Sequence, residues 1–252
     1  MIGIFDSGLG GISVWQALYD ALPHESLMYL GDGARCPYGS RSSDEVRQFT
    51  EEAVERLLAE GCKLIVLACN TATAAAITHL RERFAEIPIV GLEPAVKPAC
   101  QMTKSRKVAV VATERSLGSE KFRRAVERYG EGVEVIKAVG EGFVEAVESD
   151  QEQSPATRQK VASVIEPLIK SGVDVIVLGC THYPFLKSVI RNVVGERGVQ
   201  IIDSGEAVEK RVESLLDKYD IRASEENDAQ YEFLTFADDD YRERLRRKAF
   251  GE

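Results

Sequence analysis

The stretch GCKLIVLACNT at Gly61–Thr71 closely resembles a second stretch, GVDVIVLGCTH, at Gly172–His182. Each begins with a glycine, continues through Leu, Ile and Val, and ends with a small residue, a cysteine and two polar residues. Such a short apolar run, rich in β-branched residues, is typical of a buried parallel strand. Ligands of open α/β sheets bind at the carboxyl ends of the strands, where both cysteines would lie. The two stretches therefore predict a duplicated α/β fold with a cysteine at two equivalent strand ends.

The surrounding pattern alternates strands with helices, which is typical of parallel βαβ units with right-handed crossovers. Ser42 and Glu45 form a capping-box pattern, and Pro155 suits the first turn of a helix. The predicted strands are Ile2–Asp6, Leu27–Leu30, Leu64–Ala68, Ile87–Leu92, Lys107–Thr113, Val133–Val139, Val173–Gly179 and Val199–Asp203. The predicted helices are Gly10–Ala21, Asp44–Glu60, Thr73–Phe84, Ser119–Tyr129, Ala156–Ser171, Pro184–Val194 and Gly205–Tyr219.

We therefore expect two similar lobes, each a mainly parallel four-stranded sheet flanked by helices, with the active site in the cleft between them. The halves meet near Pro94–Lys104, where two prolines interrupt the pattern. The segment Tyr231–Phe236 (YEFLTF) is a candidate extra strand that crosses back to the first lobe. The predicted first lobe comprises 1–96 plus 208–252, and the second comprises 97–207.

The amino-acid composition is that of a globular protein and argues against nucleic-acid-binding and membrane-spanning proteins. The 252 residues are 44% hydrophobic and 29% charged, which is ordinary for a globular protein. The net charge of −9 argues against a nucleic-acid partner, because such proteins usually present a basic surface. No apolar run approaches the length that spans a membrane, and no signal peptide is evident. We expect a cytoplasmic protein with neither a nucleic-acid nor a membrane partner.

The five cysteines are not arranged as a disulfide framework or a zinc site. Their number is odd and their spacing irregular, no CxxC pair occurs, and the chain has three histidines. Cys62 and Cys100 fit a packing role, and Cys36, in the loop GDGARCPYGSRS, fits a structural or incidental one. Cys69 and Cys180 stand apart because each ends one of the two matched strands. We expect no metal at these residues.

The predicted strand ends carry polar residues in matched positions. Asp6-Ser7-Gly8 after the first strand corresponds to Ala112-Thr113-Glu114 in the second half, and Cys69-Asn70-Thr71 corresponds to Cys180-Thr181-His182. Each cysteine is expected to precede a helix, whose amino-terminal N–H groups bind carboxylates and stabilise a thiolate. The strand ends are therefore expected to hold an anionic ligand.

Two thiols on opposite sides of one carbon suggest proton exchange at a stereocentre. One thiolate removes a proton from one face while the other thiol delivers a proton to the opposite face. The Cα proton of an amino acid is weakly acidic, so the developing negative charge needs stabilisation. Helix N–H groups and the hydroxyls of Ser7, Thr71 and Thr181 are candidates for it. Asp6 and His182 are placed to move protons beside the thiols.

Four motifs, IGIFDSGLGG, YLGDGARCPYGSRS, VLACNTATA and LGCTHYP, resemble those of the cofactor-independent glutamate racemases of the aspartate/glutamate racemase superfamily. The resemblance runs in order over roughly residues 1–210. It implies two α/β lobes with substrate between them, no cofactor, a homodimer, and interconversion of L- and D-glutamate for peptidoglycan synthesis.

The resemblance also implies roles for individual residues. Cys69 falls on the cysteine that acts on the proton of the D-enantiomer, and Cys180 on the one that acts on the L-enantiomer. Asp6, Glu148 and His182 are implied to assist catalysis. The implied substrate-binding residues are Asp6, Ser7, Tyr38, Gly39, Asn70, Thr71, Thr113, Ser116, Thr181 and His182.

Three alternatives remain open at this point. A racemase for aspartate or another acidic amino acid would share these motifs, since no residue in them measures side-chain length. A non-catalytic amino-acid-binding protein also suits a two-lobed fold. A redox or metal-binding role for the cysteines ranks last.

Overall fold

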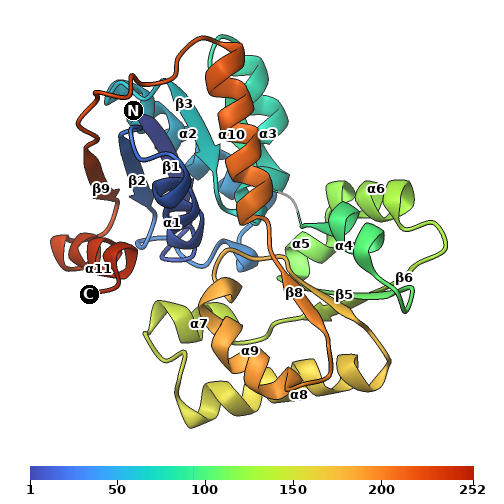
Figure 1. The fold of residues 1–252 in the computed structure, drawn as a ribbon. Coiled ribbons are helices and arrows are strands. Elements are labelled where there is room, and N and C mark those ends of the chain that lie inside the picture. The colour runs from blue at the N-terminus through green and yellow to red at the C-terminus, as the bar shows by residue number, and fades with distance from the viewer. Residues whose placement is uncertain (93) are drawn as a thin grey trace. The chain divides into compact units, whose positions relative to one another are not determined.

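The computed structural model describes residues 1–92 and 94–252, which form two compact units (Figure 1). The first unit joins Met1–Leu92 to Gly205–Glu252, and the second covers residues 94–204. Each unit is a parallel β-sheet flanked by helices. The predicted α/β fold class is therefore confirmed.

The sheet of the first unit has five parallel strands in the order β4-β3-β1-β2-β9. Their bounds are β1 (Ile2–Asp6), β2 (Leu27–Gly31), β3 (Leu64–Leu67), β4 (Ile89–Gly91) and β9 (Tyr231–Thr235). The fifth strand exceeds the predicted four because the candidate strand at YEFLTF does cross back and pairs with β2 along its whole length. In the register, Asp6 lies beside Gly31 and Phe5 beside Leu67. The carboxyl ends of β1, β2 and β3 are therefore neighbours.

Helices of the first unit begin and end where the local sequence favours it. The capping box at Ser42 and Glu45 is present, with Ser42 Oγ accepting from the Glu45 N–H and the Glu45 carboxylate accepting from the Ser42 N–H. The helix bounds are α1 (Ile12–Ala21), the 3₁₀ turn η1 (Tyr38–Ser40), α2 (Ser43–Ala59), α3 (Asn70–Arg83), α10 (Gly205–Lys218) and α11 (Asp239–Phe250).

The sheet of the second unit has four parallel strands in the order β6-β5-β7-β8. They are β5 (Lys107–Ala112), β6 (Glu134–Val139), β7 (Val175–Leu178) and β8 (Gln200–Ile202). Successive residues of β5 point to opposite faces, so Val108 and Val110 join one apolar core while Ala109 and Val111 join another. The helices are α4 (Val96–Met102), α5 (Glu114–Gly118), α6 (Glu120–Tyr129), α7 (Phe143–Glu148), α8 (Pro155–Lys170), the 3₁₀ turn η2 (Tyr183–Leu186) and α9 (Lys187–Val194).

The glycines that open the two matched stretches have the same structural role. Gly61 has φ +82° two residues after the end of α2, and Gly172 has φ +87° two residues after the end of α8. Only glycine adopts this left-handed conformation without a steric cost, and it commonly ends a helix in this position. The repeat therefore extends from the strand into the preceding helix end.

Several short helices were not predicted. α5 and α7 span one to two turns, which is too short to give a helical period in the sequence. α4 contains Pro98 in its first turn, where proline is tolerated, so the proline pattern that suggested a boundary also fits a helix. The predicted helix Pro184–Val194 is wrong at its start, because η2 precedes α9.

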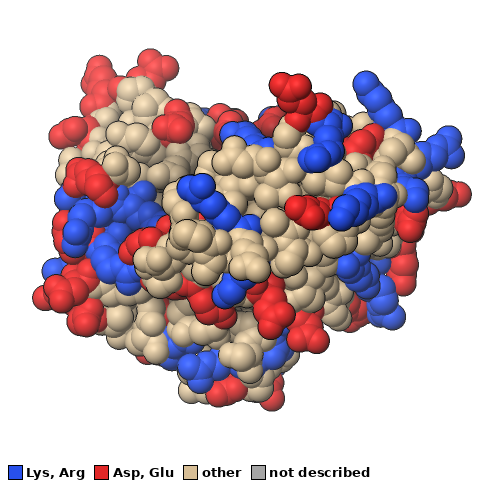
Figure 2. Space-filling view, turned by 90° about the horizontal axis from the view of Figure 1, so that it is seen from below, with Lys and Arg blue, Asp and Glu red and all other residues tan. Residues whose placement is uncertain are grey.

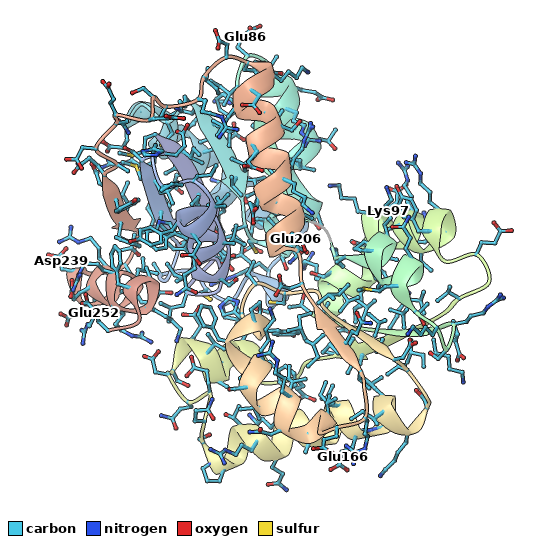
Figure 3. The ribbon with its side chains drawn as sticks, in the orientation of Figure 1. Glu86, Lys97, Glu166, Glu206, Asp239 and Glu252 are labelled. Carbon is cyan, nitrogen blue, oxygen red and sulfur yellow. The ribbon has the colours of Figure 1, made fainter. Side chains whose placement is uncertain are left out.

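The charged C-terminal stretch Arg242–Lys248 belongs to α11; Figure 3 labels Asp239, the first residue of this helix, and Glu252, which lies two residues after its end. Its arginines pair within the helix and its end, for example Arg246 with Glu243 and with Glu252. On the face drawn in Figure 2, acidic and basic side chains are interspersed with uncharged ones. Among the described residues, no helix is both long and apolar enough to cross a membrane.

Candidate active site

In the first unit, Asp6 and Cys69 lie at the carboxyl ends of neighbouring strands. Asp6 ends β1 and is fully buried, and its carboxylate accepts a hydrogen bond from the Gly8 N–H (2.9 Å). Cys69 follows β3 after Ala68, whose N–H donates to the carbonyl of Phe5 on β1. The thiol of Cys69 lies 3.5 Å from Ser7 Oγ. The structure thus brings together three residues that the sequence placed at the site.

Cys69 is also the N-cap of α3. Its Sγ accepts a hydrogen bond from the Ala72 N–H at 3.4 Å, in the position where serine or aspartate usually caps a helix. The predicted binding residues Asn70 and Thr71 form the first turn of α3 and are buried. A negative charge on this sulfur would be stabilised by that N–H and by the positive end of the helix dipole. The predicted helix after Cys69 is therefore confirmed.

The loop after β2 holds the predicted pair Tyr38 and Gly39. The ring of Tyr38 is 1% exposed and packs on Phe5, and its hydroxyl donates to the carboxylate of Asp32 (2.5 Å). Burial and the nearby Asp32 raise the pKa of Tyr38 well above its usual range. The hydroxyl and the ring of Tyr38 are thus both engaged in contacts within the first unit. Asp32 itself was missed, although it stands in the quoted motif YLGDGARCPYGSRS.

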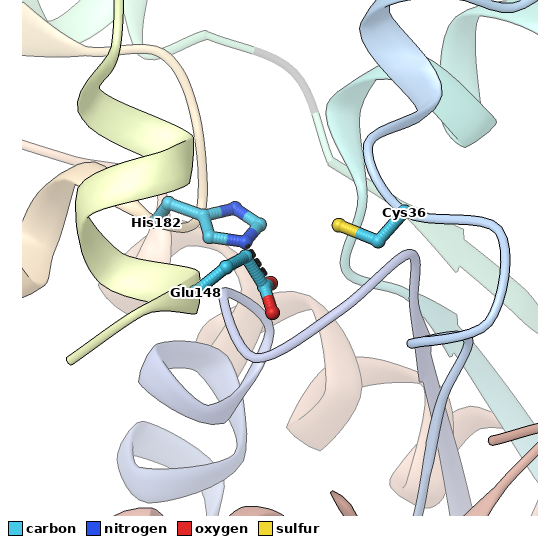
Figure 4. Close-up of side chains that lie close together, drawn as sticks. All are labelled: Cys36, Glu148 and His182. Atoms are coloured by element: carbon cyan, nitrogen blue, oxygen red, sulfur yellow. Dashed lines mark hydrogen bonds and ion pairs between the residues drawn. The ribbon is translucent and has the colours of Figure 1, made fainter.

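In the second unit, Cys180 follows β7 and lies beside a histidine–carboxylate pair. Its Sγ is 3.8 Å from Nδ1 of His182. Nε2 of the same ring is 2.6 Å from Oε1 of Glu148, the last residue of α7, and Figure 4 shows this His182–Glu148 pair. The His182 side chain is 3% exposed and that of Glu148 is 18% exposed. Such a carboxylate fixes the tautomer and orientation of the imidazole. The three residues form a chain suited to moving a proton to or from the thiol.

Hydroxyls gather at the neighbouring strand end of the second unit. Thr113 follows β5 and caps α5, with its Oγ1 accepting from the Ser116 N–H and donating to Ser116 Oγ at 2.9 Å. Ser116 and Thr181 are buried. The Gly179 N–H donates to the carbonyl of Val111, which places the ends of β5 and β7 side by side.

One expectation about Cys180 is wrong. We predicted that each cysteine precedes a helix, but Cys180 is followed by a turn and then by the four-residue η2, with α9 beginning only at Lys187. Short 3₁₀ turns of this kind are frequent at the amino-terminal ends of α-helices. The surroundings of Cys180 therefore supply an imidazole where those of Cys69 supply a helix end.

The other cysteines differ from these two. Cys62 is buried beside Met28, and burial raises the pKa of its thiol to about 11. Cys100 is half-buried, and burial also raises the pKa of its thiol. Cys36 is half-buried in the loop after β2. Within the described residues of either unit taken by itself, no three His, Cys, Asp or Glu side chains converge closely enough to hold a metal ion.

Comparison with known proteins gives consistent matches. A family model described as Asp/Glu/Hydantoin racemase matches residues 12–211. A glutamate racemase of Ectopseudomonas mendocina is 45% identical over 224 residues, covering 89% of this chain and 85% of the relative.

Solved structures agree with that match. A glutamate racemase isoform of Bacillus anthracis superimposes with a TM-score of 0.88 at 34% identity, covering all of this chain and 94% of the other. The Escherichia coli glutamate racemase, solved in complex with L-glutamate, gives a TM-score of 0.86 at 28% identity, covering 97% of this chain and 91% of the other.

Proposed function

Because the chain belongs to the Asp/Glu/hydantoin racemase family and is an amino-acid racemase, we propose that it interconverts L- and D-glutamate with Cys69 and Cys180 as the proton-transferring groups. The observation that carries the proposal is the matched placement of these two thiols at the ends of β3 and β7, each beside groups that stabilise a thiolate or exchange protons with it. The glutamate racemases among the relatives support glutamate as the substrate.

The reaction needs one thiolate and one thiol at a time. In the L-to-D direction, Cys180 as thiolate takes the Cα proton and becomes a thiol, while the thiol of Cys69 gives its proton to the opposite face of the carbon. In the reverse direction the roles exchange. No net proton is gained or lost, and the enzyme ends with its charges swapped between the two sulfurs.

The two thiolates are formed in different ways. At Cys180, the imidazole of His182 takes the thiol proton at Nδ1, and the Glu148 carboxylate stabilises the resulting imidazolium through Nε2. At Cys69, the Ala72 N–H and the α3 dipole stabilise the thiolate, and the buried Asp6 is the candidate acid–base partner.

The substrate is proposed to be held by the hydroxyl, amide and backbone groups at these strand ends. They are Ser7, Gly39, Asn70, Thr71, Thr113, Ser116 and Thr181, with the backbone of Tyr38 in place of its hydroxyl. Their N–H and O–H donors would bind the substrate carboxylates and the charge that develops on deprotonation at Cα. We also propose a cytoplasmic homodimer that supplies D-glutamate for peptidoglycan synthesis, in keeping with the bacterial relatives.

Solvent deuterium exchange tests this function. Each glutamate enantiomer is incubated with the protein in heavy water, and inversion is followed by circular dichroism and Cα deuteration by mass spectrometry. We expect the product enantiomer to carry deuterium, because the thiol that delivers its proton exchanges with solvent. Aspartate is the matched control substrate, one methylene shorter. Faster turnover of aspartate than of glutamate would contradict glutamate as the substrate, and absence of any inversion would contradict the function.

A further inference from the structure

Asp32 connects two segments of the proposed site in the first unit. It directly follows β2, and its side chain is fully buried. Its N–H donates to the carbonyl of Asp6 at 3.0 Å. Its carboxylate oxygen Oδ2 accepts from the Tyr38 hydroxyl at 2.5 Å and from Nε of Arg35 at 2.6 Å. One residue thus holds both the strand end of Asp6 and the turn of Tyr38.

Burial of the Asp32 carboxylate costs free energy, and the hydrogen bonds that offset this cost fix the position of the side chain. Removing a carboxylate from water is unfavourable unless directional donors replace the lost hydration. Burial raises the pKa of Asp32, while the hydrogen bonds from Tyr38 and Arg35 oppose that rise. Hydrogen bonds to a charged acceptor are short and geometrically strict. The carboxylate consequently fixes the hydroxyl of Tyr38, and with it the η1 backbone that includes Gly39.

Arg35 is in turn held from two distant segments of the chain. Its guanidinium lies 4.3 Å from the ring centroid of Phe49 on α2 and 4.5 Å from that of Phe236, the residue after β9. Nη1 also bonds Glu52 on α2 at 2.6 Å. Cation–π contacts of this kind restrict where the guanidinium plane can lie. The loop after β2 is therefore supported by the C-terminal segment of the same unit.

We propose that Asp32 is a positioning residue that holds the Tyr38–Gly39 backbone in place for substrate, with Arg35 as its support. The inference rests on the proposed glutamate racemase function. Loss of the carboxylate loosens a binding loop but leaves both thiols and their proton partners unchanged. Binding that is equal in the ground and transition states affects KM with little effect on kcat.

The test is steady-state kinetics of Asp32→Asn and Tyr38→Phe with both glutamate enantiomers. We expect Asp32→Asn to raise KM about tenfold or more and Tyr38→Phe to raise it about threefold to tenfold, since a charge-assisted bond is lost in each. In both variants kcat should stay within about threefold of wild type. Phe236→Leu should raise KM by a smaller factor through Arg35.

The matched control is Asp174→Asn, which also removes a hydrogen-bonded carboxylate but lies in the other unit. It should leave KM unchanged. Folding is checked by circular dichroism. Should Asp32→Asn fail to fold, Tyr38→Phe decides alone, because it removes a single hydroxyl. An unchanged KM in folded Tyr38→Phe, or a fall in kcat at constant KM, overturns the inference. If the wild-type protein racemises glutamate, the proposed function stands whether or not the variants change KM. If the wild-type protein is inactive, the proposed function itself is contradicted.

Discussion

The surroundings of Cys69 and Cys180 differ although the strands that carry them match. Cys69 caps a fourteen-residue helix and its sulfur accepts a backbone N–H. Cys180 precedes a turn and its sulfur faces an imidazole backed by a carboxylate. A fixed dipole stabilises a thiolate without exchanging a proton, whereas an imidazole can take the proton itself. The two similar units therefore place a cysteine at equivalent strand ends but surround it with different groups, which in the proposed mechanism stabilise the two thiolates in different ways.

The largest expected effect comes from replacing each thiol by a hydroxyl. Cys69→Ser and Cys180→Ser should each lower kcat about 10³-fold or more in both directions, because a serine hydroxyl is a far weaker acid than a thiol and the reaction uses both groups. Polarimetry or circular dichroism with each enantiomer measures this. Cys62→Ser, at a buried thiol of high pKa, is the control and should keep kcat. A normal rate from either catalytic variant would refute the two-thiol mechanism.

The second-largest expected effect tests the histidine–carboxylate pair that lies beside Cys180 but not beside Cys69. Glu148→Gln keeps the shape of the side chain but presents an amide to Nε2 of His182, which favours the wrong tautomer and removes the charge that stabilises imidazolium. We expect kcat to fall about 10²-fold. Glu145→Gln, an exposed change on the same helix, should have no effect. Equal kcat values for Glu148→Gln and Glu145→Gln would show that the His182–Glu148 pair has only a structural role.

A smaller effect concerns stability at the two cysteines. Serine is a good N-cap and alanine a poor one, so Cys69→Ala should be less stable than Cys69→Ser by about 1 kcal/mol. The same comparison at Cys180 should show no cap contribution, because that residue begins no helix. Urea unfolding of the four variants gives the serine-minus-alanine difference in the free energy of unfolding at each cysteine, and the two differences are then compared. A serine-minus-alanine difference at Cys180 as large as that at Cys69 would contradict the conclusion that only Cys69 caps a helix.

The smallest effect lies at the amino ends of the same two strands, where Lys63 in one copy corresponds to Asp174 in the other. Burial tends to raise the pKa of Asp174, but hydrogen bonds from Thr103, Ser105 and Lys104 outweigh it and lower the pKa to about 2. The carboxylate therefore stabilises the fold above its unfolded pKa of about 3.9, and this contribution is lost as pH falls through about 2.

Melting temperature against pH measures that contribution. Asp174→Asn should lower the melting temperature at pH 6, and the difference from wild type should shrink between about pH 4 and pH 2. A difference that stays constant over this range would show that charge at Asp174 contributes nothing. Activity at neutral pH should be unchanged in the folded variant.

The sequence predicted the strands well because their apolar runs are continuous and fully buried, as in LIVL and VIVL. It also predicted a helix after Cys69, although with its start at Thr73 and not at Asn70, and it did not predict that Cys69 caps this helix. It failed at Cys180 because the same spacing of polar residues fits both a helix start and a turn. It missed Asp32, because the hydrogen bonds that this residue accepts from Arg35 and Tyr38 are formed within one irregular loop, which gives no periodic signal in the sequence.

The β9 strand has a consequence for the order in which the protein forms. β1 and β2 are synthesised early, yet β2 stays an open sheet edge until Tyr231–Thr235 has left the ribosome, after the whole of the second unit. The second unit has all its strands in one continuous piece of chain and can fold while synthesis continues. The first unit cannot be completed until then, and its exposed edge is open to pairing with other chains during that interval.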